Sequence, residues 1–377
     1  MLPLDADHHT TTPLDPRVLE AMLPYLLERH GTPTALYARG RRLAADVESA
    51  RAAVARLFGA EPEEILFTAS ATEANNLIVK GVARPGRRLA AATEHHSVLH
   101  PLRSLERSGV ATTLLPVDKQ GRLDLDTCRE ALSGGAALLS VAYASAEIGT
   151  LQPMPEIVAL AQAAGTPVHA DAVAIAGRVA FTDGPRPDFE VITPHLFNGP
   201  AGIAALRIRR GSSLRPLVEG GIQEGGLRAG TLPVAAVVGF GRAAELSLAE
   251  GAGRAVTAER LARELRSRLA AALPDATFTG DATARIPGHL SLVVRGAEAE
   301  ALLRGLDEAG IEASSGSACL AGAGKPSHVL LACGVDPAAA RGALTFSFGA
   351  GNRPEDPERI ATTLTAVAAR LRALSPL

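Results

Sequence analysis

The sequence predicts an α/β protein with a large, mostly parallel sheet and a smaller α+β region towards its C-terminus. The first observation is a series of seven short apolar runs between residues 65 and 208, with helical patterns between most of them. Strands that alternate with helices at this spacing are typical of a parallel sheet covered on both faces. The predicted strands cover residues 65–67, 88–93, 111–117, 137–143, 166–171, 188–193 and 203–208.

The second observation is a change of pattern after Pro274, where strands (277–280, 289–294, 343–348) mix with helices (297–309, 354–374). This mixture is typical of an α+β domain. Two long helices precede it, over 232–250 and 255–272, and the glycines between them indicate a boundary near residue 251. We therefore predict an N-terminal segment that packs on the domains, a large domain and a small domain, over residues 1–12, 13–250 and 251–377.

The composition excludes several classes of partner. Lysine and arginine total 38, aspartate and glutamate total 40, and no basic block is present, so we expect no binding to nucleic acid or to an anionic membrane. No secretion pattern and no apolar run of about 18 residues are present, so we expect a cytoplasmic protein that does not span a membrane. The three cysteines are too scattered for a disulfide framework or a paired-cysteine metal site.

Two segments that follow predicted strands carry groups suited to a charged ligand. Ser70 and Thr72 stand where a strand joins a helix, so their hydroxyls and the free backbone N–H groups form an anion cup. The alternative is helix capping, which favours the same residue types. Asp171 ends another apolar strand, where a carboxylate needs a partner. A protonated ring nitrogen would serve, and so would a purely structural group.

Histidines and one cysteine are the other candidates. His95, His96 and His100 follow a predicted strand, and the spacing of the last two suits a zinc pair, although no acidic partner pattern accompanies them. Cys319 lies in a segment of small residues, which is a setting typical of an exposed, reactive thiol. The residues alone leave the use of these groups open.

Motifs spread along nearly the whole chain carry a further signal. They are Thr11–Pro16, Ala71–Asn76, Thr93–His95, Glu147–Gly149 with Gln152–Pro153, His169–Ala172, His195 with Gly199–Pro200, Gly226–Thr231, Ala313–Gly322 around Cys319, and Pro326–Leu330. In this order they resemble the cysteine desulfurases of the class V aminotransferase family. The resemblance implies the fold type I architecture of pyridoxal-phosphate (PLP) transferases and a homodimer.

The resemblance also implies roles for the candidates. The anion cup holds the phosphate of PLP, His95 stacks on the pyridine ring, and Asp171 holds the ring nitrogen. Thr231 reaches the phosphate bound by the neighbouring subunit. Cys319 takes sulfur from the substrate and leaves as a persulfide.

Several positions depart from the family pattern. The family's cofactor lysine corresponds to Leu196, which cannot form a Schiff base or move the α-proton. The arginine that grips the substrate carboxylate corresponds to Thr345. The other departures are Ser145–Ala146 and Ala174, where the family bonds the phenolic oxygen, and His8–His9 with Thr10 near the N-terminus. Of the three lysines, Lys80 and Lys119 fall outside the motif segments, which leaves Lys325 as the one candidate replacement.

Three hypotheses stay open. The first is a desulfurase-like protein without lysine chemistry, in which Cys319 accepts a persulfide or the chain acts as a scaffold, with an active desulfurase or a sulfur-acceptor protein as partner. The second is an enzyme that binds PLP or pyridoxamine phosphate (PMP) non-covalently, with His195 or His9 moving protons. The third is a repurposed pocket in which His8, His9, His95, His195 and Cys319 bind a metal or a new substrate. We expect no covalent cofactor and no metal, and ordinary desulfurase activity is the least favoured hypothesis.

Overall fold

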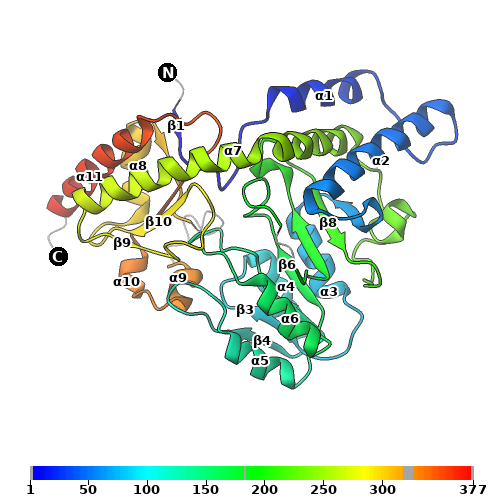
Figure 1. Cartoon of the computed structure of the whole chain (residues 1–377), viewed down its shortest axis with the longest axis horizontal. Helices are drawn as coiled ribbons and strands as arrows, with labels where there is room; N and C mark the ends of the chain where they lie inside the picture. Colours follow the sequence, from blue (N-terminus) through cyan, green and yellow to red (C-terminus); the bar gives the residue numbers. More distant parts are fainter. Residues whose placement is uncertain (1–2, 182–183, 317–325, 375–377) are drawn as a thin grey trace.

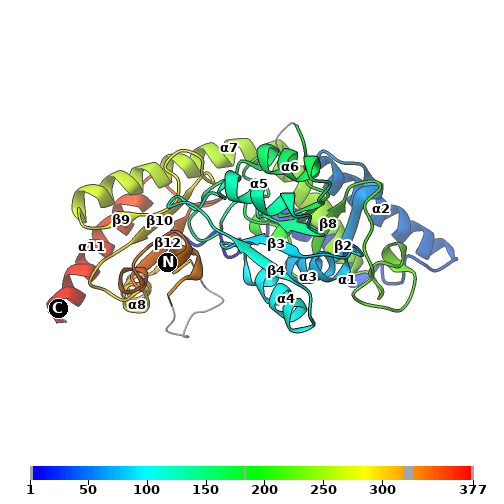
Figure 2. The ribbon, with the colours of Figure 1, turned by 90° about the horizontal axis from the view of Figure 1, so that it is seen from below.

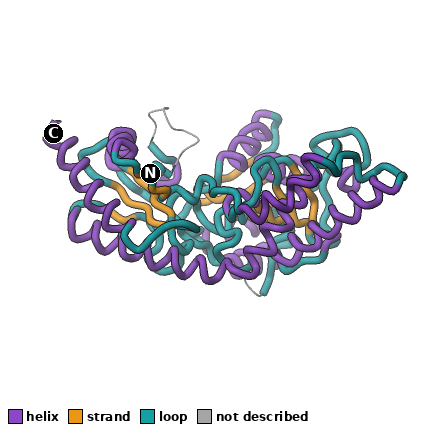
Figure 3. The backbone as a smooth tube through the Cα atoms, turned by 90° about the horizontal axis from the view of Figure 1, so that it is seen from above, coloured by secondary structure: helices purple, strands orange, loops and turns teal. Residues whose placement is uncertain are grey.

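The computed structural model describes residues 3–181, 184–316 and 326–374. A larger and a smaller body of secondary structure lie along one long helix, α7 (Val234–Ala272) (Figure 1). The strands gather in two separate groups beside this helix (Figure 3). The predicted combination of a large α/β part and a smaller α+β part is confirmed.

The larger sheet contains the seven predicted strands in the order β2-β8-β7-β6-β5-β3-β4. Every neighbouring pair is parallel except the two pairs that β8 makes with β2 and β7. The strands are β2 (Ile65–Thr68), β3 (Arg88–Ala91), β4 (Thr112–Leu115), β5 (Leu138–Ser140), β6 (Val168–Asp171), β7 (Phe189–Ile192) and β8 (Ala204–Ile208). The prediction of a mostly parallel seven-stranded sheet is confirmed.

Both faces of this sheet are buried, because successive strand residues point to opposite sides. Leu66 lies in the core beneath α3 and α4, whereas its neighbour Phe67 lies in the core beneath α2, α5, α6 and α7. Figure 2 shows α3 and α4 on one side of the strands and α5 and α6 on the other. These helices are α2 (Ala38–Phe58), α3 (Ala71–Gly81), α4 (His96–Arg107), α5 (Leu125–Ser133) and α6 (Met154–Ala163).

The prediction of two helices over 232–250 and 255–272 is wrong, because α7 is continuous. The break was predicted from Gly251 and Gly253, since each glycine costs about 1 kcal/mol in a helix interior. Tertiary packing outweighs that cost: the first half of α7 contributes to the core of the larger sheet and the second half to the core of the smaller one. The predicted domain boundary therefore falls inside a helix, and the division into domains stays a prediction.

The smaller sheet has the order β12-β10-β9 and antiparallel pairing. Leu290 and Phe346 face an apolar core that α7, α8 and α11 complete. The residues that alternate with them are polar and equally buried: His289, Ser291, Thr345 and Ser347. The elements are β9 (Thr277–Phe278), β10 (His289–Val293), β12 (Ala343–Ser347), α8 (Ala299–Glu308) and α11 (Asp356–Leu374).

The N-terminal segment packs on the smaller body. Leu4 and Ala6 lie in its apolar core, and β1 (Leu4–Asp5) pairs in parallel with β11 (Ile311–Glu312). The remaining elements are α1 (Pro16–Leu27), α9 (His328–Ala332), α10 (Pro337–Ala340) and the 3₁₀ helices η1 (Pro62–Glu64), η2 (Pro194–Leu196) and η3 (Gln223–Gly226). Within the described ranges, no helix combines the length and the apolar character needed to cross a bilayer.

Candidate active site

Asp171 ends β6 at the carboxyl edge of the parallel strands, as the sequence predicts. Its Oδ2 accepts a hydrogen bond from Asn75 Nδ2 at 2.8 Å, and its Oδ1 accepts one from the backbone N–H of Val173 at 3.0 Å. The residue is 9% exposed. Since ligands of open α/β sheets bind outside the carboxyl ends of the strands, Asp171 marks the candidate site.

Asn75 joins Asp171 to His95. The Asn75 side chain, fully buried on α3, also contacts Ser97 Oγ at 2.8 Å and His169 Nε2 at 3.0 Å. Ser97 Oγ in turn lies 2.7 Å from His95 Nδ1. The structure therefore brings the two predicted ring-binding residues into one hydrogen-bonded network. Asn75, Ser97 and His169 had no predicted role, although Asn75 and His169 lie within motifs that carry the resemblance; the signal for Ser97 was a polar residue on an apolar helix face.

His95 is the N-cap of α4, because its Nδ1 accepts the backbone N–H of Ser97. The side chain is exposed, so an imidazole stands at the surface of the site. Glu94, one residue earlier, is 1% exposed, and its Oε1 accepts the backbone N–H of Ala142 at 2.7 Å. Burial raises the pKa of Glu94 to about 8, and the nearby charge of Asp171 adds to the effect.

The predicted anion cup coincides with the N-terminus of α3. Ser70 is the N-cap, and its Oγ accepts the backbone N–H of Glu73, so this hydroxyl performs the capping role. Thr72 is exposed in the first helical turn. Glu73 pairs with Arg228 (Nε to Oε1, 2.9 Å), which offsets a negative charge beside the cup. Thr231 lies exposed beyond Arg228, between η3 and α7, and its implied role across a dimer stays a prediction.

Leu196, at the position that the resemblance assigns to the cofactor lysine, ends the short helix η2 after β7. The residue is 6% exposed and borders a small cavity of about 40 Å³ with His8 and Arg178. His195, its neighbour, is half-buried, which lowers the pKa of the imidazole. Its carbonyl oxygen accepts bonds from the N–H and the hydroxyl of Thr12, both at 2.8 Å, which fixes η2 against the N-terminal segment.

Glu147 is a contact point between the two bodies. Its carboxylate accepts a hydrogen bond from Ser327, its carbonyl oxygen accepts one from Thr345 at 3.3 Å, and Gly316 lies against its side chain. Burial raises the pKa of Glu147 to about 7. Cys319 and Lys325 lie outside the described residues, in the stretch that Gly316 and Ser327 flank.

A second group of histidines lies where the N-terminal segment meets β10. The rings of His9 and His289 are 4.8 Å apart, and His289 Nε2 contacts the carbonyl oxygen of Ala146 at 3.0 Å. Arg178 donates to the carbonyl oxygen of His8 at 3.1 Å. Burial and these neighbouring positive groups lower the pKa values of His9 and His289, the latter to about 3. The sequence predicted His8 and His9 as unusual, but gave no signal for His289.

The zinc alternative finds no support in the described ranges. His96 lies between His100 and His328, with ring centroids 4.9 and 4.7 Å away. Burial, with these neighbours, lowers the pKa of His96 to about 4. No group of three or more histidine, cysteine, aspartate or glutamate side chains there is arranged to hold a metal ion.

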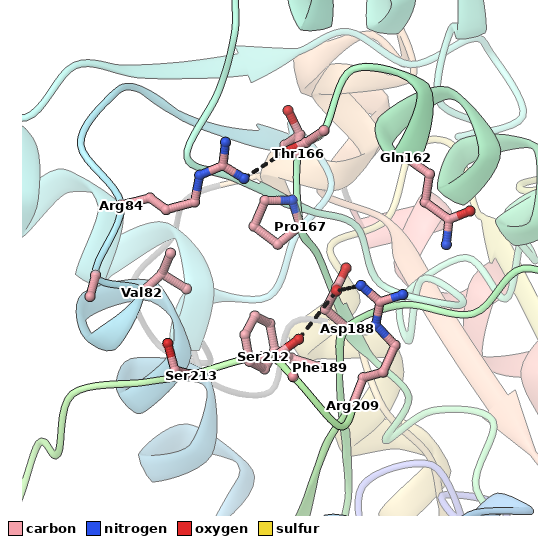
Figure 4. Close-up of a pocket in the computed structure, with 13 residues that line it drawn as sticks. Val82, Arg84, Gln162, Thr166, Pro167, Asp188, Phe189, Arg209, Ser212 and Ser213 are labelled. Carbon is pink, nitrogen blue, oxygen red and sulfur yellow. Dashed lines mark hydrogen bonds and ion pairs between the residues drawn. The ribbon is translucent and has the colours of Figure 1, made fainter.

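A larger cavity, of about 370 Å³, opens at the amino-terminal edge of β6 and β7, the edge opposite Asp171. Figure 4 shows the residues that line it. Its charged groups already have partners within the chain. Arg209 and Ser212 both bond the carboxylate of Asp188, and Arg84 bonds the carbonyl oxygen of Gly165 at 2.5 Å. This cavity therefore adds nothing to the site at the carboxyl edge.

Comparisons with known proteins bear on the whole chain. A family model described as Aminotransferase class-V matches residues 6–360. The chain is 39% identical over 385 residues to a cysteine desulfurase IscS of Anaeromyxobacter sp. (strain Fw109-5), with 100% of this chain and 95% of that protein covered. It is 41% identical to a cysteine desulfurase of Cereibacter sphaeroides, covering 98% of this chain and 97% of that one. The chain belongs to the cysteine desulfurase family.

Solved structures agree with this assignment. A NifS-like protein superposes with a TM-score of 0.90 at 31% identity, covering 98% of this chain and 100% of that chain. A NifS-like protein from Rickettsia africae ESF-5 gives a TM-score of 0.88 at 28% identity, covering 97% and 99%. The resemblance of the motifs to cysteine desulfurases and the PLP-transferase type of fold are thereby confirmed.

The cysteine desulfurase family is PLP-dependent, and the site of this chain suits part of that cofactor. Asp171 supplies a buried acceptor, and the N-terminus of α3 supplies donors for an anion. Ser145 and Thr193, after β5 and β7, carry buried hydroxyls that have no hydrogen-bond partner among the described residues. Leu196 supplies no amine. These residues fit the ring nitrogen and the phosphate of the cofactor.

Proposed function

We propose that this member of the cysteine desulfurase family has lost lysine-based PLP chemistry and acts in sulfur transfer or as a scaffold in a biosynthetic pathway, with Cys319 as a persulfide acceptor. The observation that carries the proposal is the buried Leu196, because an alkyl side chain cannot bond a carbonyl cofactor or remove a proton. Lys80 and Lys119 are exposed, Lys80 at the end of α3 remote from the anion cup. Alanine and sulfide production from cysteine is therefore expected to be negligible.

The transfer step needs neither a cofactor nor an oxidant. The thiolate of Cys319 attacks the terminal sulfur of a persulfide carried by a donor, such as an active desulfurase. The donor's sulfur–sulfur bond breaks, a new one forms at Cys319, and the donor leaves as a thiolate that takes up the proton released from Cys319. One sulfur atom moves, and no net oxidation or reduction takes place.

The other two cysteines are poor acceptors. Cys128 and Cys333 are buried, and burial raises the pKa of each thiol to about 11. Since the thiolate is the nucleophile, neither competes near neutral pH. Both flanks of the Cys319 stretch, Gly316 and Ser327, lie against Glu147 in the segment after β5, which supports a role for this thiol near that segment.

Mass spectrometry of the full chain tests the proposal. The protein is incubated with a low-molecular-weight persulfide, or with an active desulfurase and cysteine, and then digested under non-reducing conditions. We expect the mass of one sulfur atom to be added to the peptide with Cys319, and the addition to disappear in Cys319→Ser. Addition at Cys128 or Cys333 instead, or unchanged transfer in Cys319→Ser, would contradict the proposal.

A second candidate function is an enzyme with non-covalently bound PLP or PMP, which the network between Asp171 and His95 favours. Asp171 would hold the ring nitrogen, His95 would lie beside the ring, and the α3 N-terminus with Thr72 would hold the phosphate. The bound ring would act as an electron sink, with His195 and His9 as the proton-carrying groups to test. Absorption spectra with added PLP, followed by borohydride and intact mass, distinguish the cases: a bound chromophore without an adduct supports this function, and an adduct points to Lys325.

Self-association is expected, as the resemblance implies. Four leucines of α1 are exposed, Leu26 and Leu27 by 58% and 75%, and Ile222 of the segment before η3 by 87%. Apolar side chains exposed to this degree are typical of an interface. Sedimentation of the chain alone, and of a mixture with an active desulfurase, tests whether the dimer is homomeric or heteromeric. A monomer under both conditions would contradict the expectation.

A further inference from the structure

Five polar side chains form a continuous hydrogen-bonded row beneath the site. The row begins at Ser140 on β5 and passes through His169 on β6 and Asn75 on α3. It continues through Ser97 to His95 at the start of α4, with contacts of 3.1, 3.0, 2.8 and 2.7 Å. All but His95 are buried. Buried polar groups of this kind are costly unless each donor meets an acceptor. Each hydrogen bond of the row must therefore have a defined donor and a defined acceptor.

The direction can be worked out from His95. The backbone N–H of Ser97 donates to His95 Nδ1 at 3.1 Å, so Nδ1 acts as an acceptor and carries no proton. The Ser97 hydroxyl, 2.7 Å from the same nitrogen, must therefore donate to it. The proton of neutral His95 resides on Nε2.

Asn75 sets the rest of the row. Its amide nitrogen faces Asp171 Oδ2 and Ser97 Oγ, both at 2.8 Å, because the reversed amide would place two acceptors against each other. Asn75 Oδ1 then accepts from His169 Nε2, and His169 Nδ1 accepts from the Ser140 hydroxyl. Burial lowers the pKa of His169 to about 4, so this ring is neutral at pH 7 and can donate at Nε2 and accept at Nδ1. Every member of the row has a partner.

We propose that Asn75 and Ser97 are positioning residues that fix His95 in the Nε2–H tautomer and hold its ring in a fixed position relative to Asp171. His95 then carries its ring proton at Nε2, and cannot accept a second proton at that nitrogen while the row is intact. The inference goes beyond the proposed function, because the row holds His95 in the chain as it stands, whatever the site binds and whether or not Cys319 carries sulfur.

Nitrogen-15 NMR of the full chain, labelled at histidine, tests the inference directly. At pH 8.5, we expect His95 to show an unprotonated Nδ1 and a protonated Nε2, assigned by the signals lost in His95→Gln. Ser97→Ala removes one of the two donors to His95 Nδ1. The variant should therefore shift the Nδ1 resonance in the direction expected for a nitrogen that accepts fewer hydrogen bonds. It should also increase the fraction of His95 rings that carry the proton on Nδ1. Ser97→Thr, which keeps the hydroxyl, should restore the spectrum of the parent.

Two further variants keep the test falsifiable. Ser104→Ala, on the same helix but outside the row, should leave the His95 signals unchanged. Asn75→Asp should act like Ser97→Ala, because the new carboxyl group would share a proton with Asp171 and would accept a hydrogen bond from the Ser97 hydroxyl, which turns that hydroxyl away from His95. A protonated Nδ1 in the parent, or a Ser97→Ala spectrum that matches the parent, would overturn the inference. Absence of a persulfide on Cys319 would count against the proposed function alone.

Discussion

The carboxyl group of Glu94 accepts the backbone N–H of Ala142 at 2.7 Å, which ties the segment after β3 to the segment after β5. Its other oxygen is buried and has no hydrogen-bond partner among the described residues. A charge there would lack compensation, and burial accordingly raises the pKa of Glu94 to about 8. The folded chain therefore favours the neutral acid beneath the site.

Glu94→Gln tests this state through the pH dependence of stability. The pKa of Glu94 is raised on folding. The contribution of Glu94 to the free energy of unfolding is therefore complete below pH 4.5, its unfolded pKa, and is lost as the pH rises through about 8. Glutamine keeps the bond to Ala142 and cannot ionise. We expect the variant to match the parent at pH 5 and to exceed it by a few kcal/mol at pH 9, measured by urea unfolding. Glu130→Gln, on the surface of α5, should show no such gain; an equal gain would contradict the assignment.

His9→Phe tests the opposite side of the pH range. Both ring nitrogens of His9 are buried, and burial, His289, Arg178 and His8 lower its pKa well below 6.5. The folded chain favours the neutral ring of His9. The contribution of His9 to the free energy of unfolding is therefore present above pH 6.5 and is lost as the pH falls below that value. Phenylalanine keeps an aromatic ring beside His289 and should gain about 1–2 kcal/mol over the parent at pH 5, with little change at pH 8. The exposed His30→Phe is the control; a pH-independent difference for His9→Phe would refute this account.

Gly280→Ala tests the contact between the two bodies. Gly280 has φ +77°, and an added Cβ would collide with the carbonyl oxygen of Ile148, in the segment that carries Glu147. Gly109 has φ +87° with nothing within 4 Å of such a Cβ, which makes Gly109→Ala a matched control. We expect about 1–2 kcal/mol of destabilisation for the control, from its φ alone, and about 2–4 kcal/mol for Gly280→Ala, from φ and overpacking together. Equal losses in thermal unfolding would show that the contact carries no strain.

Leu196→Lys tests whether the site still accepts the family cofactor. Restoring an amine at this buried position should give a protein that forms a borohydride-stable adduct with PLP at the introduced side chain, which the parent and Leu196→Met do not form. The melting temperature should fall, because a lysine at a 6% exposed position loses hydration. A folded Leu196→Lys protein without an adduct would show that the site no longer binds PLP, and would count against the second candidate function.

Local patterns in the sequence were sufficient for the strands and most of the predicted helices. Each of the seven runs between residues 65 and 208 became one strand of the larger sheet, because alternation of apolar runs and helical patterns is a property of neighbouring residues. Gly251 shows the limit of that information: it indicated a helix end, and packing on both bodies keeps α7 continuous through it. Glycine propensity is small beside the burial of several side chains.

The sequence by itself determined the fold class, the position of Asp171 at the end of a strand, the likeness to cysteine desulfurases and the leucine at position 196. Only the tertiary structure decided how the site is held. Asn75 meets Ser97 and Asp171, which are 22 and 96 residues away along the chain, and Glu147 meets Ser327, 180 residues away. No local pattern encodes such pairs, because hydrogen-bond partners and burial are set where separate strands and helices come together.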